Sequence, residues 1–166
     1  MNSIVKMITS NGIVAAIYFL LTFFTSEFSF GAIQVRLAEC LVLLCFFRRD
    51  YAIGVTLGCV LANLLSPLGP FDVLFGGLAT LISCLLISIL RNLFFASIIP
   101  SFINAFVVGA ELYYLLESPF WYSVLTVFIG EFIAISIVGY IIFMIIGKKD
   151  YFLKAIRAER NFNFRW

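Results

Sequence analysis

Residues 120–146 read FWYSVLTVFIGEFIAISIVGYIIFMII, and this stretch decides the fold class. It is apolar over 27 residues and carries one charged side chain, Glu131. About 20 consecutive apolar residues cross the hydrocarbon core of a bilayer, so the stretch predicts a long, tilted transmembrane helix. A carboxylate inside such a helix costs several kcal/mol unless it faces protein or water. Glu131 therefore predicts a helix bundle with a polar site inside it.

The whole chain has the composition of a membrane protein. Hydrophobic residues make up 63% of its 166 residues, charged residues 12%, and the mean hydropathy is +1.12. Globular proteins carry about 25% charged residues. The length suits roughly six spans with short loops, which leaves no room for an extramembrane catalytic or nucleotide-binding domain. The net charge of +2 comes from the C-terminal tail and does not suggest nucleic-acid binding.

Residues that bind metals or act as catalysts are scarce. The sequence has no His, and its four Cys residues lie inside apolar segments without a CxxC pair. Buried free thiols are the expectation for such residues. We therefore expect no metal site, no cofactor and no catalytic residues.

Hydropathy predicts an all-α integral membrane protein with a six-transmembrane-helix bundle. The predicted segments are Ile8–Phe24, Ala32–Phe47, Tyr51–Leu65, Val73–Leu90, Phe94–Leu116 and Phe120–Ile146. Gln34, Arg36 and Glu39 interrupt the second segment, so it must pack within the bundle. The first segment is interpreted as a retained span, because no small-x-small cleavage site follows it.

Charge sorts by side of the membrane. Ten of the 11 Lys and Arg residues fall between alternate segments or near the two ends, and Arg36 is the exception. The positive-inside rule then places both termini in the cytoplasm. Residues 1–147 form the predicted transmembrane substrate-binding domain, and 148–166 form a basic amphipathic tail suited to the membrane surface.

Small residues recur every four positions in two segments. Gly54, Gly58 and Ala62 repeat in the third segment, where internal helix packing is the favoured interpretation. Gly12 and Ala16 repeat in the first segment. For this pair, internal packing and contact with a partner protein are equally supported.

Polar residues gather in the outer halves of five of the six segments. Because they avoid the predicted cytoplasmic side, they form the pattern of a binding site. The candidate substrate-binding residues are Arg36, Glu39, Asn63, Asp72, Asn104, Glu111 and Glu131.

Each candidate also has a structural interpretation. Arg36 and Glu39, three residues apart, would share one helix face and could form a buried ion pair. Asp72 could cap a helix N-terminus, and the two Asn residues could bond neighbouring helices. Glu111 and Glu131 have no basic residue nearby in their own helices, which favours a functional role.

Four acids against the single cation Arg36 favour a ligand that is cationic or rich in hydrogen-bond donors. Aromatic residues gather at the outer rim, where an interfacial belt is favoured over a lid that stacks on the ligand. They are Tyr113, Tyr114, Trp121 and Tyr122.

Several longer motifs resemble one family. The strings are Phe30-Gly-Ala-Ile-Gln-Val-Arg-Leu-Ala-Glu-Cys-Leu41, Ala62-Asn-Leu-Leu-Ser-Pro-Leu-Gly-Pro-Phe-Asp72, Phe75-Gly-Gly-Leu-Ala-Thr80, Val108-Gly-Ala-Glu-Leu112 and Gly130-Glu131. On these motifs the chain resembles the QueT family over nearly its whole length. Members of that family are substrate-binding S components of energy-coupling factor (ECF) transporters and are linked to queuosine precursors.

The resemblance implies a six-helix S component with an outward-facing pocket in the cytoplasmic membrane of a bacterium. It implies an ECF coupling transmembrane subunit and two ATPase subunits as partners, which fits a chain without a Walker motif. The positions that match the family's coupling contact are Gly12, Ala15 and Ala16. The implied ligand is a 7-deazaguanine base such as 7-aminomethyl-7-deazaguanine or queuine.

Three alternatives stay open. The chain could be an S component for another vitamin or purine. It could also be a membrane-embedded enzyme using Glu111 and Glu131 as acid and base, although it lacks a nucleophile motif. The third is a small secondary carrier, which the lack of internal inverted repeats disfavours.

Overall fold

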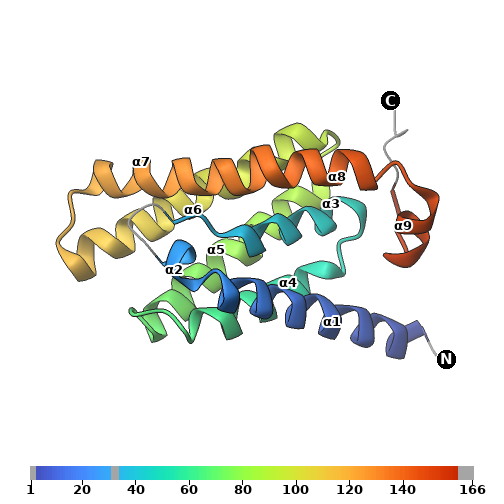
Figure 1. Ribbon diagram of the computed structural model, residues 1–166, viewed down its shortest axis with the longest axis horizontal. Helices are drawn as coiled ribbons and strands as arrows, with labels where there is room; N and C mark the ends of the chain where they lie inside the picture. Colours follow the sequence, from blue (N-terminus) through green and yellow to red (C-terminus); the bar gives the residue numbers. More distant parts are fainter. Residues whose placement is uncertain (1–2, 31–33, 161–166) are drawn as a thin grey trace.

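The computed structural model describes residues 3–30 and 34–160, and in these ranges the only regular structure is helical (Figure 1). Four helical stretches are long and apolar enough to cross a membrane. They are α1 (Ser3–Phe24), α5 (Pro70–Ile89), α6 (Leu93–Leu116) and the continuous stretch formed by α7 (Phe120–Glu131), the π-helix η2 (Phe132–Gly139) and α8 (Tyr140–Ile146).

The other two predicted segments are shorter than expected. The third is α4 (Tyr51–Asn63), and the second is the 3₁₀-helix η1 (Leu37–Leu43) followed by α3 (Leu44–Phe47). Arg36 precedes η1 with φ −89° and ψ 86°, so the predicted helical face shared by Arg36 and Glu39 is wrong. Residues 32–33, at the start of that predicted segment, lie outside the described residues.

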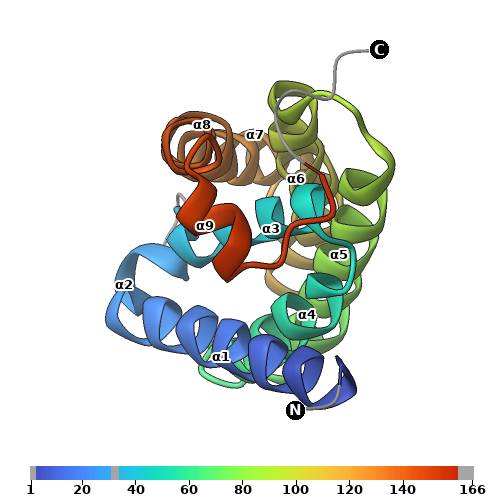
Figure 2. The ribbon, with the colours of Figure 1, turned by 90° about the vertical axis from the view of Figure 1, so that its right-hand side faces the viewer.

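The short second segment lies at the centre of the bundle. Helices α1, α4, α5, α6 and α7 pack in chain order, each against the next, and η1 contacts α1, α5 and η2. Figure 2 shows α3 surrounded by these helices. Val42, Leu43 and Phe47 are completely buried. The prediction that this segment packs within the bundle is therefore confirmed.

Close approach between α1 and α4 depends on glycine. A Cβ atom at Gly54 would lie 2.6 Å from the backbone oxygen of Asn11, and one at Gly58 would lie 2.7 Å from the Cβ of Tyr18. The Gly54 N–H also donates to the Asn11 side chain at 2.7 Å. Internal packing of the small-residue repeat in α4 is thus confirmed.

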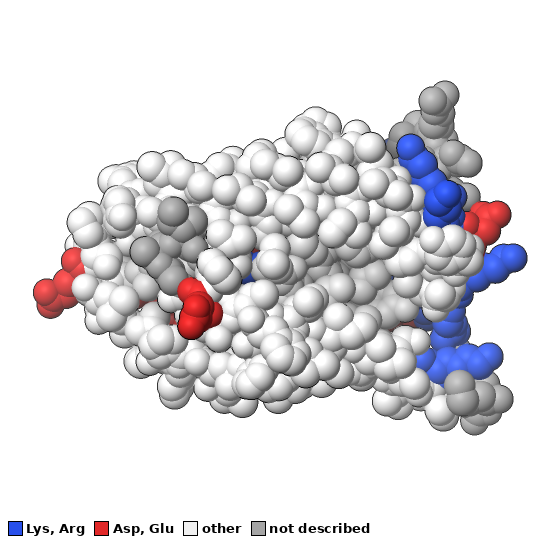
Figure 3. Space-filling model, in the orientation of Figure 1, with Lys and Arg blue, Asp and Glu red and all other residues white. Residues whose placement is uncertain are grey.

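One end of the molecule carries almost all the cations, and we call it the basic end (Figure 3). Helix α1 begins there, and the short helix α9 (Asp150–Ala155) packs there (Figure 1). The Phe152 ring lies 6.1 Å from that of Phe47, and the Tyr51 hydroxyl donates to the carbonyl of Ile156 at 3.0 Å. The described part of the tail, up to residue 160, therefore closes this end of the bundle.

Candidate functional site

The seven candidate residues are all buried, and helix ends bring several of them together. Arg36 immediately precedes η1, and Glu39 lies within it. Asn63 ends α4, and Asp72 lies in the first turn of α5. Asn104 and Glu111 lie on α6, and Glu131 ends α7.

Arg36, Asn63 and Asp72 form a hydrogen-bonded chain. The Arg36 guanidinium donates to Asn63 Oδ1 at 3.2 Å, and Asn63 Nδ2 donates to the backbone oxygen of Asp72 at 2.8 Å. The Ser66 hydroxyl donates to the Asp72 carboxylate. Asn63 therefore joins α4 to α5, as the structural interpretation predicted, and it also orients the buried Arg36.

Asp72 is not a helix cap. Gly69 holds the N-cap position of α5 with φ +51°, and Pro70 follows as the first helical residue. Glycine accommodates the left-handed backbone, and proline suits the first helical position because it has no N–H to leave unpaired. The Asp72 carboxylate is consequently free to face the interior rather than the helix end.

Glu39 is held by side chains from two other helices. Its Oε1 accepts from the Tyr18 hydroxyl at 2.6 Å and from the Thr80 hydroxyl at 3.1 Å. Its Oε2 has no hydrogen-bond partner among the residues that the structure describes. Among the described residues, Arg36 and Glu39 do not form the ion pair that their spacing suggested, and Glu39 is held by side chains of α1 and α5 instead.

The remaining acids face other polar groups. Glu111 is buried beside Asp72. Glu131 is buried near Glu39, Arg36 and Asn104. The fold thus gathers four acids around Arg36, as the sequence predicted.

Buried hydrogen-bonding capacity is concentrated here. In the described residues, the buried side-chain atoms without a protein partner lie in this cluster, apart from atoms of Ser101, Thr56 and Arg157. They are Gln34 Oε1, Arg36 Nε, Glu39 Oε2, Asp72 Oδ1 and both side-chain polar atoms of Asn104, Glu111 and Glu131. Because buried polar atoms are costly when unpaired, this cluster is suited to a polar ligand.

A cavity of about 430 Å³ reaches this cluster from the end opposite the basic end. Asp72, Gln34 and Ser66 supply polar lining, and Phe30, Leu112 and Tyr122 are among the other walls. The volume lies within the range of small-molecule sites. Of the seven candidates, Asp72 lines this cavity, and the other six are buried without lining it.

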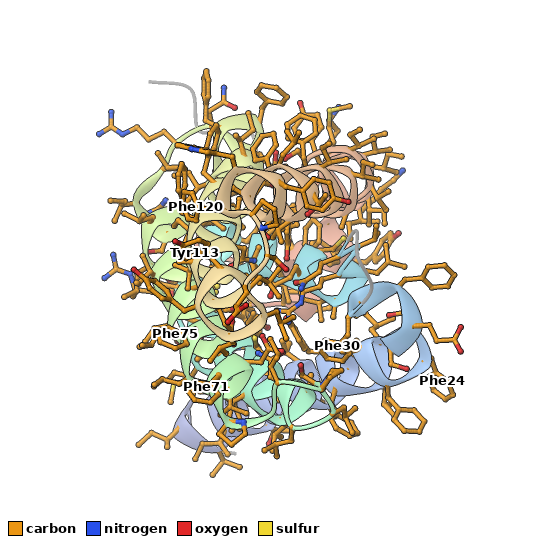
Figure 4. All side chains as sticks on the ribbon, turned by 90° about the vertical axis from the view of Figure 1, so that its left-hand side faces the viewer. Phe24, Phe30, Phe71, Phe75, Tyr113 and Phe120 are labelled. Carbon is orange, nitrogen blue, oxygen red and sulfur yellow. The ribbon has the colours of Figure 1, made fainter. Side chains whose placement is uncertain are left out.

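The sequence missed several residues of the site. The centroid of the Phe30 ring lies 5.5 Å from the guanidinium carbon of Arg36. Figure 4 shows Phe30 toward the interior, while Phe24 and Phe71 point outward. Tyr18 and Thr80 hold Glu39. Phe30 and Thr80 lie in two of the motifs that resemble the family, whereas nothing in its local sequence separates Tyr18 from an ordinary helix residue. Gln34 was visible as a polar interruption of an apolar segment.

The predicted partner stripe divides between two surfaces. Gly12 has open space around its Cβ position, and Ala16 is exposed. Ala15 is buried, and a Cβ at Gly58 would come within 3.1 Å of its Cα. The three residues therefore cannot present one continuous face.

The outer aromatic residues match the favoured interpretation. Tyr113, Tyr114, Trp121 and Tyr122 are all exposed, as expected for an interfacial belt. Tyr122 also lines the cavity mouth. In the described part of the chain, no three Cys, Asp or Glu side chains are grouped to hold a metal ion.

The π-helix starts directly after Glu131. A π-helix displaces the backbone from regular helical register, and such segments often occur at functional sites. Here the Cys40 thiol donates to the Ala134 carbonyl at 3.0 Å, and the Ser136 hydroxyl donates to the Ser97 carbonyl at 2.9 Å. The irregular segment is thus tied to η1 by Cys40 and to α6 by Ser136.

Apolar membrane-length helices around a buried polar site, together with the family match that follows, define a multi-pass transport protein of the cell membrane. The family model described as QueT transporter matches residues 8–148. The chain belongs to this family. It is 35% identical over 151 residues to the queuosine precursor transporter QueT of Lactococcus lactis subsp. cremoris (strain MG1363), covering 81% of this chain and 88% of that protein. No solved structure matches it.

Proposed function

We propose that this protein is the substrate-binding S component of an ECF transporter and binds a 7-deazaguanine precursor of queuosine, such as 7-aminomethyl-7-deazaguanine or queuine. Family membership and the similarity to a queuosine precursor transporter support this class of ligand. The observation that carries the proposal is the surplus of buried, unpaired acceptor atoms on Asp72, Glu111 and Glu131.

The chemistry of the base matches these acceptors. A guanine-like edge presents adjacent N–H donors, and one carboxylate can accept two hydrogen bonds from it. The ammonium group of the aminomethyl base can pair with a second carboxylate. Asp72 lines the cavity and Glu111 lies beside it, so these two acids are the proposed first contacts.

Other side chains complete the proposed pocket. The Phe30 ring faces the cavity and offers an apolar surface for stacking the flat base. The Gln34 side chain also lines the cavity and has an unpaired oxygen. Glu39, Glu131 and Asn104 are buried without lining the cavity, and Asn63 holds Arg36 toward the acids.

We propose that all six apolar segments lie within the membrane and that both termini are cytoplasmic. The short stretches Leu37–Phe47 and Tyr51–Asn63 are then completed by the non-helical chain that leads to the pocket. The gathering of the cations at one end of the molecule supports cytoplasmic termini (Figure 3). The described tail, residues 148–160, would close the cytoplasmic side at the membrane surface.

In this proposal, transport energy comes from partner subunits. An ECF coupling transmembrane subunit would contact the exposed Gly12 and Ala16 on α1, while two ATPase subunits would hydrolyse ATP. Small residues permit the close helix approach that such a contact needs. Ala15 would act indirectly, by seating α1 against α4.

The purified protein should be titrated with 7-aminomethyl-7-deazaguanine, 7-cyano-7-deazaguanine, queuine and thiamin in a calorimeter. We expect saturable binding of at least one deazaguanine and none of thiamin. Binding of thiamin alone would overturn the proposed ligand class.

Two further measurements address the other classes of protein. Ligand recovered chemically unchanged excludes an enzyme, since an enzyme would convert it. Uptake into vesicles should require the coupling and ATPase subunits, whereas uptake by this chain alone would identify a secondary carrier.

A further inference from the structure

A continuous chain of buried hydrogen bonds joins α1 to the wall of the candidate ligand cavity. It begins at Tyr18, whose hydroxyl donates to Glu39 Oε1 at 2.6 Å, and it ends at Asp72, which lines the cavity. We call it the Tyr18–Asp72 network. Its members are at most 3% exposed, and they are Tyr18, Glu39, Thr80, Cys59, Asn63 and Asp72.

The middle of the network crosses from η1 to α5 and α4. The Thr80 hydroxyl of α5 lies 3.1 Å from Glu39 Oε1 and 3.2 Å from Cys59 Sγ of α4. The Asn63 amide donates to the same sulfur at 3.4 Å and to the backbone oxygen of Asp72 at 2.8 Å. Because every step is within hydrogen-bonding distance, side chains of α1, η1, α4 and α5 form one connected set.

Thr80 gives the network two arrangements. A hydroxyl carries one hydrogen, so Thr80 donates either to Glu39 or to Cys59 at any moment. When it donates to Cys59, Glu39 depends more strongly on Tyr18. Coupling between distant groups needs an element with discrete arrangements of this kind. A change at one end of the network can therefore alter how the other end is held.

Helix α1 is the least covered of the four membrane-length stretches. Within its most apolar window 28% of the residues are buried, compared with 39% to 50% in the other three. Few internal contacts therefore set its position, and Tyr18 links it to the buried acids. The position of α1 and the arrangement of the network are thus not independent.

We propose that Tyr18 is a positioning residue for the ligand site and acts on Asp72 through the network. Its hydroxyl holds Glu39, and the network carries that constraint to the first turn of α5, where Asp72 lines the cavity. Tyr18 is not among the described residues that line the cavity, so it acts without touching the ligand. The inference rests on the proposed function, because it concerns a ligand bound at Asp72.

Calorimetric titration of the full chain with 7-aminomethyl-7-deazaguanine and with queuine tests the proposal. Tyr18→Phe should raise Kd about tenfold, which corresponds to about 1.4 kcal/mol and matches the loss of one buried hydrogen bond. Tyr51→Phe is the matched control, because Tyr51 is also buried and its hydroxyl donates to the carbonyl of Ile156 at the basic end. It should lower the melting temperature and leave Kd unchanged.

Two changes at Thr80 separate hydrogen bonding from packing. Thr80→Val removes the hydroxyl at nearly constant volume and should raise Kd, whereas Thr80→Ser keeps the hydroxyl and should bind like wild type. A role in packing alone predicts the opposite order, since serine lacks the methyl group. That opposite order would overturn the proposal.

A cycle of melting temperatures without ligand tests whether the two ends are connected. Ser66 donates to the Asp72 carboxylate at the cavity end. The losses from Tyr18→Phe and Ser66→Ala should not add in the double variant, whereas those from Tyr51→Phe and Ser66→Ala should add.

Two results would overturn the proposal: additive losses for Tyr18→Phe with Ser66→Ala, or a wild-type Kd in Tyr18→Phe when its melting temperature is lowered. If the wild-type protein binds no deazaguanine, the proposed function fails instead, and the ligand-free cycle still decides whether the network connects α1 to the cavity wall.

Discussion

The Tyr18 hydroxyl donates a 2.6 Å hydrogen bond to Glu39, which joins α1 to the buried acids. Both residues are almost completely buried. The same helix carries the exposed Gly12 and Ala16 on its outer surface. Helix α1 therefore contacts the candidate ligand site and also carries the proposed partner surface. A shift of α1 would move the Tyr18 hydroxyl relative to Glu39.

Removing this hydroxyl should destabilise the protein. Tyr18→Phe leaves Glu39 with one donor fewer in a buried setting, which costs about 1–3 kcal/mol. We expect a lower melting temperature in detergent. Tyr114→Phe is the control, because Tyr114 is 79% exposed. Equal melting temperatures for wild type and Tyr18→Phe would show that this bond contributes nothing to stability.

The buried acids should determine ligand affinity. Truncating an acid that accepts ligand hydrogen bonds leaves buried donors unpaired at a cost of about 1–3 kcal/mol, or roughly 5- to 150-fold in Kd. Calorimetric titration with 7-aminomethyl-7-deazaguanine measures this. The variants are Glu39→Gln, Asp72→Asn, Glu111→Gln and Glu131→Gln.

The largest losses are expected for Asp72 and Glu111, since Asp72 lines the cavity and Glu111 lies beside it. Glu27→Gln changes an exposed acid and should leave Kd unchanged. Each variant is first checked for folding by its melting temperature. Wild-type affinity in all four variants would show that these acids are structural.

Two adjacent alanines should respond differently to enlargement. Ala16→Leu changes an exposed position and should weaken co-purification with the coupling subunit while leaving Kd intact. Ala15→Leu overpacks the contact with Gly58 and should cost about 1–3 kcal/mol of stability. If Ala16→Leu co-purifies normally, the exposed face of α1 is not the partner surface.

Replacing Gly54 of α4 and replacing Gly12 of α1 by alanine should have opposite effects on stability. Gly54→Ala places a methyl group 2.6 Å from the Asn11 backbone, so we expect destabilisation by about 1–3 kcal/mol. Gly12→Ala meets nothing within 4 Å and should stabilise α1 by about 0.5–1 kcal/mol. Melting temperatures in the same detergent compare them. Similar shifts for both variants would contradict the assigned α1–α4 contact.

The orientation can be measured directly. At the C-terminus, a reporter that works only in the cytoplasm should be active, and one that works only outside the cell should be inactive. A cysteine placed in the loop at residue 118 should react with a membrane-impermeant reagent from outside. The cation asymmetry between the two ends motivates both expectations. Labelling at residue 118 only after the membrane is opened would reverse the proposed topology.

The sequence by itself determined that this is an all-helical membrane protein, and it singled out seven polar residues that all prove to be buried. Membrane-spanning helices such as the one over Phe120–Ile146 can be recognised in the sequence because a helix in lipid must present an apolar surface along its length. The polar site residues can be recognised because an acid such as Glu131 is costly in lipid and must therefore face the inside of the bundle. Helix boundaries at Leu116, Phe120 and Ile146 were also predicted.

Only the tertiary structure decided which side chains contact one another. Arg36 and Glu39 are three residues apart, yet Arg36 donates to Asn63 and Glu39 accepts from Tyr18 and Thr80. The backbone at Arg36 is not helical, and local spacing predicts contacts only when the chain is regular. Likewise Ala15 and Ala16 are neighbours in sequence, but α4 covers one and leaves the other exposed. Such contacts arise between distant segments, so no local pattern encodes them.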